Sequence, residues 1–459
     1  MLATVSYREL VQSQRAYFNS GATKPLAFRQ AQLRKLRDEI QRRQEDIIQA
    51  LRQDLGKPQF ESYLVEIYGS LKEIDYAIKN LPRWLKPQRV KVGAEVWPSS
   101  AQVYPDPLGV VLAISPWNYP FSLAIAPLVG ALAAGNCAVL KPSEASAATS
   151  RILAELLNDA FPQDYLYVAE GDAETSQALL AEKFDHIFFT GGTRIGQIIM
   201  EAAARQLTPV TLELGGKSPC IVTPEIDLKE TAKRIIWGKF LNAGQTCIAP
   251  DYLLVQEEVL PRLLPALQQT LTEFYGADPA QSPDYGRMIN DRQFERLVSL
   301  LGEGEILTGG QFDRASRYLA PTLVVNPNLD GALMGEEIFG PILPILTYRA
   351  LEDAIAFVNA RPKPLALYLF SRNRSDQEQV LAQTSAGGVC LNDTILQVGV
   401  IEMPFGGVGP SGIGAYHGKH TFDTFSHAKS VLNKPFWGEF NLRFPPYGNK
   451  LERVRKLFR

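Results

Sequence analysis

The chain has little cysteine, little histidine and almost no net charge. Only four of its 459 residues are cysteine, and no two have CxxC spacing. This excludes a disulfide framework and a cysteine-based zinc site, and it favours a reducing compartment. The formal net charge of −2 offers no basic face for nucleic acid. The histidines at 417, 420 and 427 match no common metal-site spacing, so we expect no bound metal.

Long hydrophobic runs are also lacking. The most apolar stretch, Phe121 to Gly135, has about 15 residues and contains Pro127, too short to cross a bilayer of about 30 Å as a helix. Residues 1–14 contain no apolar core of a signal peptide. We therefore expect a cytoplasmic protein with no transmembrane segment and a buried helix at 121–135. The basic tail, residues 446–459, would allow peripheral membrane contact if it formed an amphipathic helix.

What the chain does contain is ordinary for a globular protein, with 46% hydrophobic and 21% charged residues. Apolar residues recur at helical spacing through about residues 7–81, which predicts a block of surface helices. From residue 108, short apolar strands alternate with helices, and a second such series starts near 208. This alternation predicts an α/β fold with a doubly wound parallel sheet, followed by a second α/β domain.

One cysteine stands out by its surroundings. Cys247 follows Ala243 and Gly244, small residues that leave room for a substrate to approach a thiol. By itself this stretch fits a buried structural cysteine as well, because free cysteine is among the most buried residue types. A Cys–His hydrolytic site is a further alternative for this thiol, although the chain offers only four histidines.

A second stretch, residues 212–217, favours the reactive interpretation. Glu213 lies between Leu212 and Leu214 and is followed by two glycines. Burial among apolar neighbours raises the pKa of a carboxyl group, which suits a general base that works near neutral pH.

These two stretches, together with further motifs in the same order along the chain, resemble the aldehyde dehydrogenase superfamily. The further motifs are Pro116-Trp117-Asn118-Tyr119-Pro120, Lys141-Pro142-Ser143-Glu144, Phe189-Thr190-Gly191-Gly192-Thr193, Glu336-Glu337-Ile338-Phe339-Gly340-Pro341 and Pro404-Phe405-Gly406-Gly407. The resemblance implies a cofactor domain from residues 1–85, 108–208 and 405–430, and a catalytic domain from 209–404. It also implies a small β oligomerisation segment from 86–107 and 431–445.

The segment Phe188 to Gly196 has the order strand, glycine turn and helix start that a dinucleotide needs, but not the G-x-G-x-x-G spacing. Its glycines alone would equally mark a tight turn. The resemblance implies a variant turn in which Gly191, Gly192, Thr193 and Gly196 approach the dinucleotide.

The resemblance also implies the other cofactor contacts. Lys141 and Glu144 would bind the adenosine ribose, and Trp117, Glu337 and Phe339 the nicotinamide end. A carboxylate at Glu144 would repel a 2′-phosphate, which favours NAD, while Lys141 offsets part of that repulsion and leaves NADP open.

The mechanism that the resemblance implies uses Cys247 as nucleophile. The thiolate adds to the aldehyde to give a thiohemiacetal, whose oxyanion receives hydrogen bonds from the Asn118 amide and the Cys247 N–H. After hydride transfer leaves a thioester, Glu213 activates water. A CoA-acylating or esterolytic relative and a non-catalytic binding protein are the alternatives.

Residues 405–409, 416–427 and 443–447 resemble the class 3 branch in particular. This implies fatty, aromatic or apocarotenoid-type aldehydes as substrates and a homodimer as the assembly.

Overall fold

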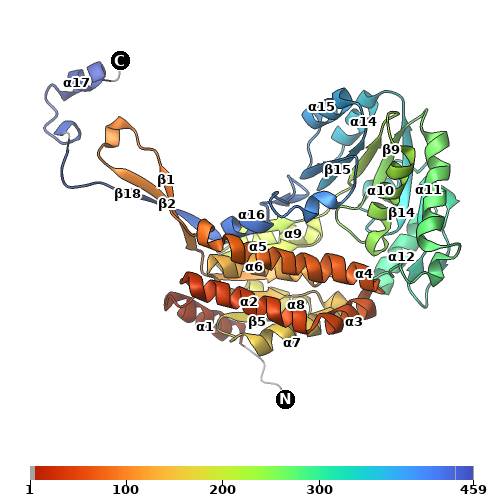
Figure 1. Ribbon diagram of the computed structural model, residues 1–459, viewed down its shortest axis with the longest axis horizontal. Helices are drawn as coiled ribbons and strands as arrows, with labels where there is room; N and C mark the ends of the chain where they lie inside the picture. The colour runs from red at the N-terminus through yellow and green to blue at the C-terminus, as the bar shows by residue number, and fades with distance from the viewer. Residues whose placement is uncertain (1–5, 440, 458–459) are drawn as a thin grey trace.

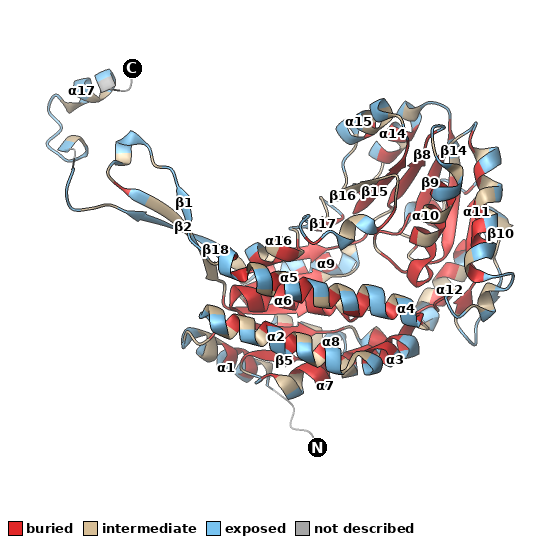
Figure 2. Cartoon of the chain, in the orientation of Figure 1, coloured by how far each residue is buried: buried red, intermediate tan, exposed pale blue. Residues whose placement is uncertain are grey.

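The computed structural model describes residues 6–439 and 441–457. Figure 1 shows two α/β lobes and a β arm that extends away from them toward the C-terminus. In Figure 2 the central strands of both lobes are largely buried, whereas the arm is mostly exposed. Within the residues described, no helix has the length and apolar character needed to cross a membrane.

The first lobe is built on a six-stranded sheet of order β17-β7-β6-β3-β4-β5. Its strands are parallel except β17, which runs antiparallel to β7. In sheet order, the strands are β17 (Gly412–Ile413), β7 (Val210–Glu213), β6 (His186–Thr190), β3 (Val110–Ile114), β4 (Cys137–Lys141) and β5 (Leu166–Val168).

The predicted start of the second domain at residue 209 is wrong. β7 lies inside the predicted catalytic segment, yet it pairs with β6 through Ile187↔Val210 and Thr190↔Glu213. The alternation of strands and helices does not tell to which sheet a strand belongs. Here helix α9 (Thr193–Ala204) packs beside both β6 and β7 and returns the chain to the same sheet.

Helices of the N-terminal block pack with α6 and α7 beside this sheet. The predicted buried helix is α6 (Ser122–Ala134), in which every residue from 124 to 134 is buried. Gly130 is needed there, because a Cβ would lie 2.2 Å from Thr421 Cγ2 of α16. The other helices of the lobe are α1 (Tyr7–Asn19), α2 (Leu26–Arg42), α3 (Gln44–Leu55), α4 (Gln59–Glu61), η1 (Ser62–Tyr68), α5 (Gly69–Trp84), α7 (Ala147–Ala160), α8 (Ala173–Leu180) and α16 (Gly418–Thr424).

The second lobe is built on a seven-stranded sheet, parallel except for β10 at its edge. In sheet order the strands are β10 (Glu305–Thr308), β13 (Thr322–Val325), β14 (Ile342–Tyr348), β9 (Tyr252–Gln256), β8 (Pro219–Val222), β15 (Ala366–Phe370) and β16 (Gly388–Leu391). The hairpin β11 (Phe312–Asp313) and β12 (Tyr318–Leu319) is separate. The helices of the second lobe are α10 (Leu228–Phe240), α11 (Leu260–Tyr275), α12 (Asp291–Leu300), α13 (Ala332–Gly335), α14 (Leu351–Asn359) and α15 (Arg374–Gln383).

The arm is an antiparallel sheet of β1 (Gln88–Val90), β2 (Ser100–Pro107) and β18 (Ser426–Asn433). The expected second oligomerisation segment, residues 431–445, therefore has the wrong bounds, because its strand runs over Ser426–Asn433. β18 starts at residue 426 because it continues directly from α16 and pairs Ser426 with Pro107 at the base of the arm. The tail contains a short helix, α17 (Lys450–Leu457).

Candidate active site

The predicted site residues gather along the carboxyl edge of the six-stranded sheet. In the sheet, β4 and β5 lie on one side of β3, and β6 and β7 lie on the other. Such a change of side marks the strand ends where a crevice forms in open α/β sheets. Asn118 follows the end of β3, Lys141 ends β4, Gly191 follows β6 and Glu213 ends β7. Parallel strands therefore bring together residues that are up to about a hundred positions apart, at the place where ligands bind in open α/β sheets.

The loop that carries Cys247 comes from the second lobe. After α10, Asn242 and Ala243 both have φ +52°, and Gly244 has φ +76°. A Cβ on Gly244 would lie 2.3 Å from the Gly340 carbonyl oxygen, so only glycine fits there. Between residues 241 and 250, Cys247 is the one residue that is not fully buried. The loop thus presents a thiol at the surface of the site.

The thiol lies in an environment that disfavours its ionised form. Burial, together with the nearby carboxylates of Glu337 and Glu213, raises the pKa of Cys247 to about 12. The group is therefore a neutral thiol at neutral pH, and its proton must leave when the chemistry begins.

Glu213 is the unpaired carboxyl group of the site. Its side chain is 2% exposed, and neither carboxyl oxygen has a hydrogen-bond partner among the residues described. Burial alone raises its pKa well above the ordinary value, as expected from its apolar neighbours. Glu213 and Cys247 interact electrostatically with each other and with the Tyr416 side chain.

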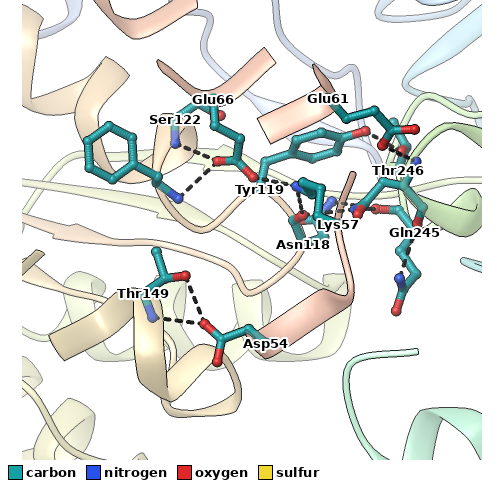
Figure 3. Close-up of polar contacts among 12 residues, drawn as sticks. Asp54, Lys57, Glu61, Glu66, Asn118, Tyr119, Ser122, Thr149, Gln245 and Thr246 are labelled. Atoms are coloured by element: carbon teal, nitrogen blue, oxygen red, sulfur yellow. Dashed lines mark hydrogen bonds and ion pairs between the residues drawn. The ribbon is translucent and has the colours of Figure 1, made fainter. Parts of the chain in front are cut away.

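Asn118 lies next to the Cys247 loop. Its side-chain Nδ2 donates a hydrogen bond to the Gln245 carbonyl oxygen at 3.0 Å, and the neighbouring Tyr119 hydroxyl contacts Thr246 Oγ1 at 2.7 Å (Figure 3). An amide nitrogen carries two N–H donors, and the Gln245 bond uses one of them. The second is the candidate donor to a substrate oxygen.

Glu337, Phe339 and Trp117 form another wall. Burial raises the pKa of Glu337 to about 8, and a backbone hydrogen bond from Gly216 lowers it in part. A Cβ on Gly215 would lie 2.0 Å from Glu337 Oε2, which explains the glycine. Phe339, at φ +50°, meets the Trp117 ring edge to face, with the centroids 5.1 Å apart. This contact brings together Trp117 and Phe339, two of the three residues expected at the nicotinamide end.

The glycine turn after β6 fits a dinucleotide pyrophosphate. Gly191 N–H donates to the Glu213 carbonyl at 2.9 Å, and helix α9 begins at Thr193 without a side-chain cap. A Cβ built on Gly192 would meet no atom within 4 Å, whereas one on Gly196 would lie 2.6 Å from Leu214 Cδ2. Gly192 thus faces open space before a helix N-terminus, and Gly196 lets α9 pack closely against the sheet.

Lys141 and Glu144 form an ion pair at the end of β4. Lys141 Nζ lies 2.9 Å from Glu144 Oε2. The lysine side chain is 2% exposed, while that of Glu144 is 55% exposed. The pair therefore presents a carboxylate to the crevice, with a buried cation behind it.

Sequence reasoning missed the groups that support this site. Lys217 Nζ pairs with Asp251 and donates to the carbonyls of Leu333 and Glu336, while Asp251 accepts the Ile338 N–H at 3.0 Å. These contacts hold the loop that carries Glu337. Lys217 directly follows the two glycines after Glu213, but nothing in the sequence places Asp251 beside it.

Two further buried groups were also missed. Lys239 has no partner for its Nζ among the residues described, and burial lowers its pKa to about 8. Glu61 accepts the Asn242 N–H at 3.0 Å, and burial raises its pKa to about 7.

The fold thus defines a two-lobed α/β protein with a dinucleotide-type crevice at its first sheet and a cysteine loop from its second. The sequence model described as "Aldehyde dehydrogenase family" matches residues 3–431. The chain therefore belongs to the aldehyde dehydrogenase family, and it is an enzyme of that family.

Named relatives agree with the class 3 resemblance. The chain is 46% identical to the 4,4′-diaponeurosporen-aldehyde dehydrogenase of Staphylococcus aureus, with 97% of each chain covered. It is also 46% identical to the dimeric NADP-preferring aldehyde dehydrogenase of Canis lupus familiaris, covering 97% of this chain and 99% of the relative. The solved structure of the substrate-bound state of Staphylococcus aureus AldH is 45% identical with a TM-score of 0.97, covering 99% of this chain and all of that one.

Proposed function

We propose that this protein oxidises aldehydes to carboxylic acids with NAD, and with NADP as a second cofactor. One observation carries the proposal: a partly exposed thiol (Cys247), an unpaired buried carboxyl (Glu213) and an amide donor (Asn118) meet at the carboxyl edge of the first sheet. These are the nucleophile, base and oxyanion donor that aldehyde oxidation requires.

In the proposed reaction, the Cys247 thiol gives its proton to water, and the thiolate Sγ bonds to the aldehyde carbon as the C=O π electrons move to oxygen, giving a thiohemiacetal oxyanion. The oxygen that gains negative charge receives hydrogen bonds from Asn118 Nδ2 and the Cys247 N–H. The nicotinamide cofactor, when bound, supplies the hydride acceptor. Glu213 takes a proton from the water that attacks the resulting thioester, the carbon–sulfur bond breaks, and the acid leaves.

The cofactor proposal rests on charges and open space. Gly191, Gly192 and Thr193 offer the pyrophosphate a helix N-terminus, with Gly196 packed behind it. The exposed Glu144 carboxylate would accept from ribose hydroxyls and disfavour a 2′-phosphate, with Lys141 reducing that penalty. Trp117, Glu337 and Phe339 would hold the nicotinamide end.

We infer an apolar aldehyde as the substrate: medium- or long-chain, aromatic or apocarotenoid. The Cys247 side chain packs against the apolar core of the second lobe and interacts electrostatically with Tyr119, Tyr368 and Tyr416. Such surroundings favour hydrocarbon over charged substrates. The name of the Staphylococcus aureus relative, an apocarotenoid-type aldehyde dehydrogenase, supports the same class.

A homodimer is the proposed assembly. The arm and the segment after it expose large apolar side chains, among them Val90, Leu432 and Phe436. An exposed apolar sheet with open edges is a typical interface, and one relative is named as dimeric. Sedimentation of the purified protein tests this, with a stable monomer as the contrary result. A cytoplasmic location and peripheral membrane contact through α17 stay predictions.

The experiment that tests the function is NADH absorbance with purified protein, NAD or NADP, and aldehydes of increasing chain length plus benzaldehyde and an apocarotenal. We expect turnover that rises with chain length or conjugation. If no aldehyde is oxidised while the thiol still reacts with an alkylating agent, a CoA-dependent or esterolytic activity becomes the better proposal. No reaction of any kind would favour a binding protein.

A further inference from the structure

The main-chain carbonyl of Asn118 is held from two sides by buried side chains. Lys57 Nζ donates to it at 3.0 Å, and Asn242 Nδ2 donates to it at 2.8 Å. None of these three residues is more than 3% exposed. A single carbonyl with two buried side-chain donors has little freedom to move.

Lys57 is itself firmly anchored. Its Nζ forms an ion pair with Glu66, and both side chains have no exposed surface (Figure 3). The second carboxyl oxygen of Glu66 accepts the N–H groups of Phe121 and Ser122, where α6 begins. The Lys57 ammonium also lies 4.1 Å from the centre of the Tyr119 ring. The cation therefore links Asn118 to the helix that follows it.

The segment between β3 and α6 needs such support. Residues 115–121 belong to neither a helix nor a strand, so no ladder of backbone hydrogen bonds fixes them. Lys57 holds this segment at the Asn118 carbonyl, and Glu66 holds it at two N–H groups near its end. Together they fix the direction in which the Asn118 side chain leaves the backbone.

Asn242 ties the same carbonyl to the Cys247 loop. Its Nδ2 donates both to Asn118 O and to Gln245 O at 3.1 Å, and Gln245 O also accepts from Asn118 Nδ2. The backbone of Asn242 is in the left-handed region, and its N–H donates to Glu61. The oxyanion donor and the nucleophile loop are thus joined through one asparagine.

We propose that Lys57 is a positioning residue: with Asn242 opposite, it holds the Asn118 carbonyl so that the Asn118 amide points at the developing oxyanion. The inference rests on the role proposed above for Asn118. A displacement of about 1 Å in a catalytic group can lower a rate about 100-fold, so loss of Lys57 should slow hydride formation without weakening cofactor binding.

A double-mutant cycle tests this. The measured quantity is the rate of NADH formation in the first turnover, beside the dissociation constant for NADH. Asn118→Ala should slow that rate roughly 100- to 1000-fold, and Lys57→Met roughly 10- to 100-fold. In the Asn118→Ala background, Lys57→Met should add almost nothing, because its target is gone. If Lys57→Met does not fold, Lys57→Gln replaces it.

Asp54→Asn is the matched control. Asp54 lies three positions before Lys57, is 9% exposed and binds Ala148 N, Thr149 N and Thr149 Oγ1, with no contact to Asn118 in Figure 3. It should lower stability while leaving the first-turnover rate unchanged. Additive losses in the cycle, an unaffected Lys57→Met enzyme, or an equal slowing in Asp54→Asn would each overturn the inference. A harmless Asn118→Ala would instead remove the proposed role of Asn118, and the inference with it.

Discussion

Two groups of buried charged side chains differ in how their charges are paired. Lys57 and Glu66 form an ion pair whose remaining hydrogen-bonding atoms reach the backbone of residues 118–122. Glu213 has no partner for either oxygen, and Glu337 has none for Oε1, among the residues described. Paired charges with complete hydrogen bonding hold a structure together, whereas unpaired groups with shifted pKa values mark sites of chemistry. The same fold keeps both kinds.

The largest expected effect comes from replacing the proposed nucleophile, Cys247, which lies near the unpaired carboxyl groups. Cys247→Ala should lower aldehyde oxidation by roughly 10⁴-fold or more, because no other group supplies the thiohemiacetal. NADH absorbance measures the loss, and NADH fluorescence should show unchanged cofactor binding. Measurable turnover in this variant would exclude Cys247 as the nucleophile.

Glu213→Gln should separate the two halves of the reaction. The variant keeps the thiol, so NADH should form in a burst that equals the enzyme concentration. Steady-state turnover should then fall roughly 100- to 10,000-fold, because no carboxylate activates water. Stopped-flow absorbance resolves the two phases. Full steady-state turnover would show that a different group acts as the base.

Substitutions in the Lys57–Glu66 pair should lower the stability of the fold. Glu66→Gln leaves the buried Lys57 ammonium without its counter-charge, which should cost about 3–5 kcal/mol in the free energy of unfolding. Adding Lys57→Met removes the orphaned charge and should recover part of the loss. Urea denaturation measures both. Glu213→Gln is the matched variant in the unpaired group, and it should cost far less, since that carboxyl has no partner to lose. If Glu66→Gln and Glu213→Gln lowered the free energy of unfolding equally, the paired and unpaired carboxyl groups would not differ in their contribution to stability.

Sequence patterns predicted the residues of the proposed chemistry better than the Lys57–Glu66 pair. Cys247, Glu213 and Asn118 lie in short motifs whose residue types carry the chemistry, and the strand ends bring them together. Lys57 lies in the short loop between α3 and α4, and Glu66 lies in η1. Charged residues in such a surface-helix block are ordinary for a solvated face. The burial of Lys57 and Glu66 depends on contacts with residues 118–122, more than fifty positions away, and no local pattern records such contacts.

The sheet to which β7 belongs could not be predicted from the sequence either, because it too depends on contacts between distant segments. Val210–Glu213 has the apolar character of any buried strand, and its partner is chosen by the path of α9. Asp251 and Lys217 likewise meet because they precede β9 and β8, which pair side by side in the second sheet. Sequence patterns predict which segments are strands or helices, whereas their neighbours follow from tertiary packing.

The smallest expected effect concerns the influence of the Glu337 charge on the pKa of Cys247. After burial, the Glu337 carboxylate is the largest cause that raises the pKa of Cys247 to about 12. The pKa of Glu337 is about 8, so this group is ionised over the range in which the thiol titrates. Glu337→Gln removes that negative charge, and the thiolate should form at lower pH. The midpoint of the pH dependence of iodoacetamide alkylation should fall by roughly one unit or more.

Glu66→Gln is the control for this measurement. The Glu66 carboxylate is compensated by Lys57 and is not among the groups that shift the pKa of Cys247, so its alkylation midpoint should stay in place. An unchanged midpoint in Glu337→Gln would mean that the Glu337 carboxylate does not raise the pKa of the thiol. A shift to higher pH would mean that Glu337 acts on the thiol as a neutral hydrogen-bonding group, because loss of a nearby negative charge can only lower that pKa.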